Sequence, residues 1–154
     1  MSASDDFRAA MSRYPTGVTV VSTYHEGRAV GMTANSFASV SLEPPLVLWS
    51  VGKTGSRGQV FSDAKSFSIC FLGSDQSEIA KFCADNEALP AGRWSENAYG
   101  FPVVENCPVV LDCRQHAVYP AGDHDIIIGE VLRISMRDEA GALTFYRSQY
   151  GTME

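Results

Sequence analysis

Short hydrogen-bonding side chains alternate with apolar ones over residues 31–41 (GMTANSFASVS). A flat ring such as a flavin has apolar faces and a polar edge, so its pocket needs apolar walls and a few short donors and acceptors. Gly31 permits close approach of the backbone, and Met32, Phe37 and Val40 supply apolar surface. A Ser/Thr-rich edge strand has the same composition, so this pattern allows a cofactor wall without requiring one.

A second candidate is the segment 50–57 (SVGKTGSR), which connects an apolar run to a predicted helix. The first turn of a helix presents free N–H groups and partial positive charge, which attract anions. Lys53 and Arg57 add positive charge, and Thr54 and Ser56 add hydroxyls. The segment predicts a phosphate site, with a solvated loop as the alternative. It lacks the spacing of a nucleoside-triphosphate loop.

A third candidate is His124, which follows Gly122 and Asp123 in a predicted turn. A histidine beside a flavin can contact a nicotinamide or move a proton, and Asp123 can orient its ring. A structural Asp-His turn is the alternative. The remaining histidines and the four cysteines show no metal-ligand spacing, so we expect no metal. No G-x-G-x-x-G follows a strand, so a nicotinamide would dock on the flavin itself.

Strands dominate the elements that must position these residues. We expect one β-rich domain, a small barrel over residues 1–154, with two or three short accessory helices. The run 46–51 is almost wholly apolar and is expected to be buried on both faces. We expect helices with Ser4 and Ser74 as N-caps at 5–14 and 75–84, and a third at 55–64. The expected strands are 17–25, 28–34, 36–41, 46–51, 66–72, 109–119, 124–136 and 143–146, with a loop at 85–101 and a turn at 120–123.

The composition is that of a globular protein: 45% of the 154 residues are hydrophobic and 19% are charged. The formal net charge of −6 argues against binding to nucleic acid or to an anionic membrane surface. No apolar run approaches the roughly 20 residues of a membrane span. Residues 1–8 lack the basic start and apolar middle of a signal peptide, so we expect a cytoplasmic protein.

These segments occur in an order that resembles the short-chain flavin reductase family. The matching stretches are 7–23 (FRAAMSRYPTGVTVVST), 31–51 (GMTANSFASVSLEPPLVLWSV), 66–72 (SFSICFL), 122–131 (GDHDIIIGEV) and 143–151 (LTFYRSQYG). The resemblance implies a split β-barrel of Greek-key type, assembled as a homodimer. It also implies FMN or FAD as cofactor, NADH or NADPH as hydride donor, and a flavin-dependent monooxygenase as partner.

The same resemblance assigns roles to individual residues. The ring of the flavin would be lined by Met32, Thr33, Ala34, Asn35 and Ser36. Its ribityl and phosphate end would contact Ser50, Val51, Gly52, Ser56 and Arg57. His124 would lie near the nicotinamide, and Tyr150 would close the pocket. The loop 86–100 departs from the family pattern, and its Arg93, Trp94 and Tyr99 would either cover a substrate or pack.

The resulting hypothesis is hydride transfer from the nicotinamide C4 to the flavin N5, without a covalent nucleophile. Reduced flavin would then leave for a partner oxygenase. Two alternatives remain open from the sequence. One is a reductase whose bound flavin serves another acceptor, such as a corrin, a metal chelate or an iron compound. The other is a flavin-binding sensor or storage protein without turnover.

Overall fold

The computed structural model describes residues 2–138 and 141–154, and over these residues the chain is mainly β with three helices, as the sequence predicts. The helices are α1 (Ala3–Ser12), α2 (Ser56–Asp63) and α3 (Ser77–Asp85). The strands are β1 (Thr16–Gly17), β2 (Thr19–His25), β3 (Arg28–Ala34), β4 (Ala38–Ser41), β5 (Leu46–Gly52), β6 (Ser66–Phe71), β7 (Trp94–Glu96), β8 (Pro102–Val104), β9 (Val109–Ala121), β10 (His124–Met136), β11 (Ala142–Tyr146) and β12 (Gln149–Met153).

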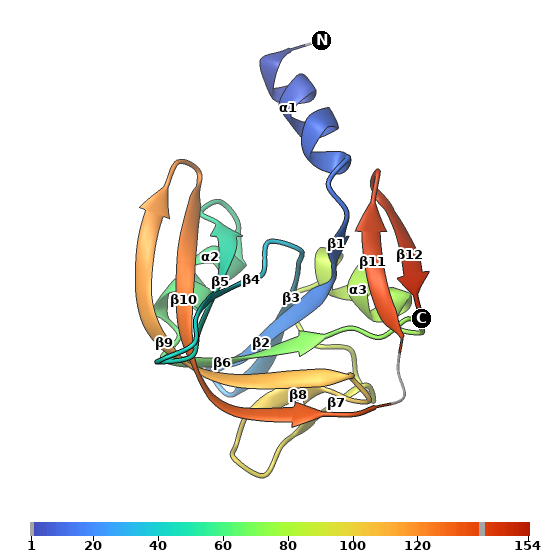
Figure 1. Cartoon of the computed structure of the whole chain (residues 1–154). Helices are drawn as coiled ribbons and strands as arrows, with labels where there is room; N and C mark the ends of the chain where they lie inside the picture. The colour runs from blue at the N-terminus through green and yellow to red at the C-terminus, as the bar shows by residue number, and fades with distance from the viewer. Residues whose placement is uncertain (1, 139–140) are drawn as a thin grey trace.

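Seven strands form one antiparallel sheet in the order β3-β2-β6-β9-β10-β5-β4. The long strands β9 and β10 bend sharply, so that the sheet curls on itself (Figure 1). Two irregularities in their pairing, at Ile128/Gly129 and Val131/Arg133, lie along this bend. Within the described residues the edge strands β3 and β4 do not pair with each other, so the barrel is split rather than closed.

Two apolar clusters stabilise this arrangement. The first fills the barrel, where the Trp49 ring meets Phe61 edge-on at 5.1 Å and Phe67 at 6.1 Å. The second lies under α3, where Ile79 and Cys83 pack against strand residues such as Cys70. Packed side chains therefore lie on both sides of the central strands β2 and β6, and the four cysteines are buried.

Helix α1 begins earlier than the sequence predicts. Ser2, not Ser4, is its N-cap: the Ser2 hydroxyl accepts from the Asp5 N–H at 3.2 Å, and the Ser2 N–H donates to the Asp5 carboxylate at 3.3 Å. This reciprocal capping box fixes the start two residues upstream of the predicted one. No residue of α1 is buried, and the helix projects away from the barrel (Figure 1).

The β9–β10 hairpin is longer than predicted, because its turn is confined to Gly122 and Asp123. Gly122 adopts a φ of 65°, which suits such a tight turn. Pro120 therefore lies inside β9, opposite Asp125, and not in the turn. This end of β9 extends beyond the residues that pair with β6, so the missing N–H of Pro120 leaves no ladder bond unmade.

Strand β5 is not buried on both faces, contrary to the prediction. Val47, Trp49 and Val51 are buried in the barrel, while the alternate residues are only half-buried. Both neighbours of β5, which are β4 and β10, lie in the same sheet, and no described helix covers the outer face of Leu48 and Ser50. The apolar run therefore reflects a strand with one covered face.

Three further elements differ from the prediction. Helix α3 begins at Ser77, and its N-cap is Gln76, not the predicted Ser74. The Gln76 side chain accepts a hydrogen bond from the Gly73 N–H and donates one to the Glu105 carbonyl. The predicted loop 85–101 contains β7, which pairs with β8. Strand β12 was not predicted, and it pairs with β11 in a small sheet that also holds β1.

Candidate functional site

The fold brings three of the predicted segments together at one end of the barrel. The end of β3 lies beside the end of β5, and β10 starts directly opposite the end of β5, where His124 and Gly52 are register partners. The segment that follows β5 leads into α2. We call residues 52–57 the anion loop and residues 32–36 the ring wall.

A side chain joins the ring wall to β5. The Ser50 N–H donates to the Ser36 hydroxyl at 2.9 Å, and this hydroxyl lies 3.4 Å from the Ser50 carbonyl. Strand β4 pairs with β5 only as far as Leu48, opposite Ala38. Ser36 therefore continues the ladder with its side chain where the β4 backbone has turned away.

The residues of the ring wall do not all face one surface. Met32 and Ala34 pack toward the barrel cluster, whereas the Thr33 hydroxyl donates to the Ala80 carbonyl of α3 at 2.6 Å. Asn35 and Ser36 are exposed. Because side chains alternate along a strand, five successive residues cannot line a single ring with side chains alone. The surface they share is the backbone edge of β3.

That edge is partly occupied. The Gly31 N–H donates to the Glu87 carbonyl at 2.8 Å, so residue 31 faces the open edge of the sheet. Backbone groups alternate between the two edges of a strand, so the N–H of Thr33 faces the same open edge. A Cβ on Gly31 would lie 2.3 Å from Leu89 Cδ2. A side chain at residue 31 would therefore force Leu89 to shift, a different constraint from the cofactor approach that the sequence suggests.

The anion loop has the features of an N-terminal helix site. Gly55 is the N-cap of α2 at a φ of 95°, and no side chain caps the helix. Lys53, Thr54 and Ser56 are exposed. A Cβ on Gly58 would lie 2.3 Å from the Gly52 carbonyl oxygen, so the first turn packs directly on the end of β5. The free N–H groups of this turn are therefore available to an anion.

Arg57 does not point freely into this loop. Its guanidinium donates to the carbonyls of Gly31, Cys83, Ala84 and Asn86. Of the other predicted phosphate-end residues, Val51 is fully buried in the barrel, so that only its backbone can contact a ligand.

His124 is held at the tip of the hairpin. Its Nδ1 lies 2.8 Å from an Asp123 carboxylate oxygen, and this hydrogen bond holds the pKa of the Asp123 carboxyl below its ordinary value. A Cβ on Gly52 would lie 3.9 Å from His124 Nε2. The Lys53 N–H donates to the Asp123 carbonyl at 2.9 Å. The hairpin tip is thus fastened to the anion loop, with half of the His124 side chain exposed.

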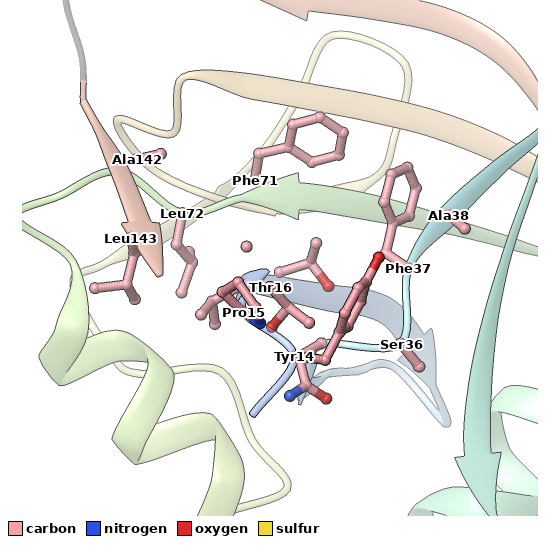
Figure 2. A pocket seen from close by; sticks show the side chains of 14 residues that line it. Tyr14, Pro15, Thr16, Ser36, Phe37, Ala38, Phe71, Leu72, Ala142 and Leu143 are labelled. Atoms are coloured by element: carbon pink, nitrogen blue, oxygen red, sulfur yellow. The ribbon is translucent and has the colours of Figure 1, made fainter. Parts of the chain in front are cut away.

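A cavity of about 620 Å³ begins at the ring wall and extends toward the small sheet. Leu72 and Leu143 lie on one side of it and Ser36 and Phe37 on the other (Figure 2). The Phe37 ring meets Phe71 edge-on at 5.0 Å. The volume and apolar lining suit a planar organic ligand. Sequence reasoning named Asn35 and Ser36 of this lining as ligand contacts and Phe37 as apolar surface, but missed the rest: Tyr14, Pro15, Thr16, Gly17, Val18, Thr19, Ala38, Phe71, Leu72, Ala142 and Leu143.

Tyr150 does not line this cavity. It lies on β12, 5.1 Å from the Phe145 ring, and burial together with the Asp85 carboxylate raises its pKa. In the loop 86–100, Trp94 packs edge-on against Tyr24, and Tyr99 stacks on Arg133 at 3.9 Å. These two aromatic residues therefore pack against the barrel and do not cover the site.

Within residues 2–138 and 141–154, no three His, Cys, Asp or Glu side chains gather in a way that could hold a metal ion. No helix in this part of the chain is long and apolar enough to cross a membrane.

Comparisons with known proteins agree on one family. The model of the flavin reductase like domain matches residues 11–154. The FMN reductase (NADH) SmoA of Agrobacterium fabrum is 46% identical over 136 residues, which are 88% of this chain and 78% of that protein. The reductase subunit HsaB of a flavin-dependent monooxygenase from Rhodococcus jostii is 35% identical over 150 residues, which are 96% and 77% of the two chains.

A solved structure confirms the fold at full length. The NADH:FAD oxidoreductase SgcE6 of Streptomyces globisporus, in complex with NAD and FAD fragments, is similar with a TM-score of 0.91 at 32% identity. The match covers 99% of this chain and 93% of that one. With a family match over almost the whole chain and this agreement in structure, the chain belongs to the family of flavin reductase like domains.

Proposed function

We propose that this protein uses NADH or NADPH to reduce FMN or FAD, as a single-domain cytoplasmic reductase. The observation that carries the proposal is the meeting of ring wall, anion loop and hairpin tip, joined by the Ser36–Ser50 and Lys53–Asp123 hydrogen bonds. The relatives named as NADH-dependent FMN and FAD reductases support the same chemistry.

The residues present fit a flavin. The open edge of β3 offers backbone donors to the polar edge of the ring, and the cavity beside Ser36 offers apolar surface to its face. Met32 and Thr33 shape this wall from behind, while Asn35 and Ser36 present polar side chains. A bound flavin would supply the redox chemistry by accepting a hydride from the nicotinamide.

The tail of the flavin would extend along the end of β5. Ser50 and the backbone of Val51 and Gly52 would contact the ribityl chain. The phosphate would lie at the N-terminus of α2, where free N–H groups and the Ser56 hydroxyl meet the charge of Lys53. The close contact between Gly58 and Gly52 keeps this cradle narrow.

His124 would contact the nicotinamide. The hydrogen bond between Nδ1 and Asp123 fixes the orientation of the imidazole and leaves Nε2 directed toward Gly52. From this position the histidine can orient a carboxamide or donate a proton to a reduced product. The apolar residues of the neighbouring cavity, such as Phe37 and Phe71, would limit the access of water to the rings once a flavin is bound.

We further propose that the protein is a homodimer. Helix α1 projects from the barrel (Figure 1). It exposes Phe7 and Met11, which are 65% and 53% accessible, and Tyr14, two residues after its end, is 73% accessible. The half-exposed outer face of β5 is a second apolar surface without cover. Burying such surfaces against a second copy would remove them from water. Size-exclusion chromatography with light scattering tests this, and a monomeric mass would contradict it.

The physiological acceptor of reduced flavin is proposed to be a flavin-dependent monooxygenase. The support is that a relative such as HsaB is the reductase subunit of one. The cavity at the ring wall is half-open to solvent at exposed residues such as Asn35 and Ser36, which suits a flavin that enters and leaves.

The test is NADH and NADPH oxidation by the purified chain, with and without added FMN or FAD. We expect oxidation that depends on added flavin and flavin that is lost during purification. A flavin that stays bound through purification, with turnover only in the presence of a corrin or a ferric chelate, would favour the reductase with another acceptor. Persistent bound flavin without oxidation of either nicotinamide would favour a sensor or storage protein.

A further inference from the structure

Arg57 stands between the two halves of the proposed flavin site. We propose that Arg57 is a positioning residue, which holds the anion loop against the ring wall by binding backbone carbonyls and does not itself bind the flavin phosphate. The inference rests on the function proposed above and assigns the phosphate charge of that site to Lys53.

The hydrogen bonds of Arg57 engage both terminal nitrogens of its guanidinium. Nη1 donates to the carbonyls of Gly31 at 3.0 Å, Cys83 at 2.5 Å and Asn86 at 3.0 Å. Nη2 donates to the Ala84 carbonyl at 3.1 Å. Nη1 carries two N–H groups and has three acceptors, so it has no donor left for a phosphate. Within the described residues, the second N–H of Nη2 and the Nε–H make no hydrogen bond, but the contacts of Nη1 and Nη2 hold the whole group against the end of α3.

Three of these acceptors belong to one helix end. The carbonyls of Cys83 and Ala84 are in the last turn of α3, and Asn86 is its C-cap. Carbonyls in this position have no donor within their own helix, and a positive charge beside them is favourable. The last turn of α3 contains no basic residue. Arg57 therefore supplies both the donors and the charge from a different element, and its removal would leave this helix end unsatisfied.

The fourth acceptor ties the same side chain to the ring wall. Gly31 immediately precedes the wall, and its N–H is already fixed by Glu87. Thr33, two residues further, donates its hydroxyl to the Ala80 carbonyl, one turn earlier in α3. The end of α3 is thus connected to β3 by Thr33 and to both β3 and α2 by Arg57. Through these contacts, the end of α3 helps to set the distance between the ring wall and the anion loop.

Lys53 is in the opposite situation. Its backbone N–H is fixed by the Asp123 carbonyl, and its side chain is exposed. Within the described parts of the chain, the Lys53 ammonium makes no hydrogen bond or ion pair with another residue. A phosphate at the N-terminus of α2 can therefore attract Lys53 without breaking an existing contact, whereas moving the Arg57 guanidinium toward it would break its bonds to the end of α3.

The experiment compares flavin with and without its phosphate. Dissociation constants for FMN and for riboflavin are measured on the full-length wild type and on R57K, R57Q and K53Q. The steady-state kcat and the KM for FMN are measured on the same proteins. K65Q is the control, because Lys65 is exposed and lies immediately before β6, outside the anion loop. Thermal melting shows which variants fold.

We expect K53Q to raise the Kd for FMN about tenfold and to leave the Kd for riboflavin unchanged. R57Q should raise both constants by a similar factor, about tenfold, because the ring wall and the loop move apart. R57K should behave like R57Q, since a single ammonium cannot reach four carbonyls. For both Arg57 variants we expect a higher KM for FMN with kcat nearly preserved at saturating flavin.

The contrary result is equally specific. If R57Q weakens FMN binding alone, and R57K restores it, Arg57 is a phosphate ligand and the proposal is wrong. If R57Q does not fold, the test uses R57K alone. A similar increase in its dissociation constants for FMN and for riboflavin supports the proposal, and an increase for neither or for FMN alone contradicts it. Amide exchange at residues 83–86 should be faster in R57K than in K53Q, and equal exchange would also contradict the clamp. A wild type that binds neither flavin would overturn the proposed function as well.

Discussion

The Ser36 hydroxyl accepts a hydrogen bond from the Ser50 N–H at 2.9 Å, and this bond joins the two strands that form the proposed flavin site. Ser50 leads into the anion loop, and Ser36 ends the ring wall at the mouth of the 620 Å³ cavity. The Ser36 side chain therefore links the ring wall to the strand that leads into the anion loop, in addition to the link that Arg57 makes from α2 to Gly31.

Replacing this hydroxyl should weaken flavin binding. A single hydrogen bond contributes about 0.5–1.5 kcal/mol, so Ser36→Ala should raise the Kd for FMN by roughly two- to tenfold. Titration of FMN fluorescence measures the change. Ser39→Ala is the matched control, because Ser39 is an exposed serine on β4 to which no such bond is made. Equal affinities for the two variants would show that the Ser36–Ser50 bond does not position flavin.

His124 should affect the nicotinamide more than the flavin. We expect His124→Ala to lower kcat/KM for NADH by about tenfold or more, because it removes a group that orients the donor or moves a proton. The Kd for FMN should change less than twofold, within ordinary variation of a surface substitution. His25→Ala is the control, since His25 ends β2 at a different hairpin. A loss of FMN affinity with an unchanged KM for NADH would place His124 on the flavin instead.

Gly129 should be intolerant of any side chain. A Cβ there would lie 2.7 Å from the Phe67 ring and 3.1 Å from Cys113 Cβ, at the bend of β10. Gly129→Ala should lower the free energy of unfolding by about 1–3 kcal/mol through overpacking. Gly17→Ala is the control, because nothing lies within 4 Å of its Cβ position. Urea denaturation measures both, and equal midpoints would contradict the packing described for the bend.

Alkaline pH should destabilise the fold through buried thiols. Burial raises the pKa of Cys83 to about 11 and that of Cys113 to about 12, from an ordinary 9.0. The unfolded thiols ionise first, so this contribution to stability is complete below pH 9.0 and is lost as pH rises through the folded values. Each group contributes a slope of at most about 1.4 kcal/mol per pH unit.

The comparison that isolates this effect is the pH slope of the unfolding free energy above pH 9 in the wild type and in Cys113→Ala. The substitution leaves a small cavity, which lowers stability at every pH, but it should also flatten the slope. Identical slopes would mean that the Cys113 thiol is not the group that titrates.

The sequence predicts the segments of the site better than their contacts. The β2–β3 hairpin, the strand before the anion loop and helix α2 follow from local patterns: the turn at Glu26 and Gly27, the apolar run 46–51 and the glycine before Ser56. These signals lie within a few residues of one another, so they can be recognised without knowledge of the fold.

The cavity could not be predicted, because its lining combines Tyr14, Phe71 and Leu143, which are far apart in sequence. The roles of Gly31 and Arg57 were also inaccessible. The contact of Leu89 with Gly31 and the hydrogen bonds from Arg57 to the end of α3 join residues that are far apart in sequence. Local patterns do not predict such tertiary contacts. Pro120 led to the wrong turn prediction. It is accommodated within β9 because β6 does not extend far enough to pair with this end of the strand, which only the sheet arrangement shows.

The central claim is that this chain passes a hydride from a nicotinamide to a flavin that it binds reversibly. The most direct measurement is the oxidation of NADH by purified, flavin-free protein as FMN is added, followed by the loss of absorbance of the reduced nicotinamide. We predict a rate that is absent without flavin, saturates with FMN and falls in His124→Ala. No flavin-dependent oxidation of NADH or NADPH, with either FMN or FAD, would contradict the claim.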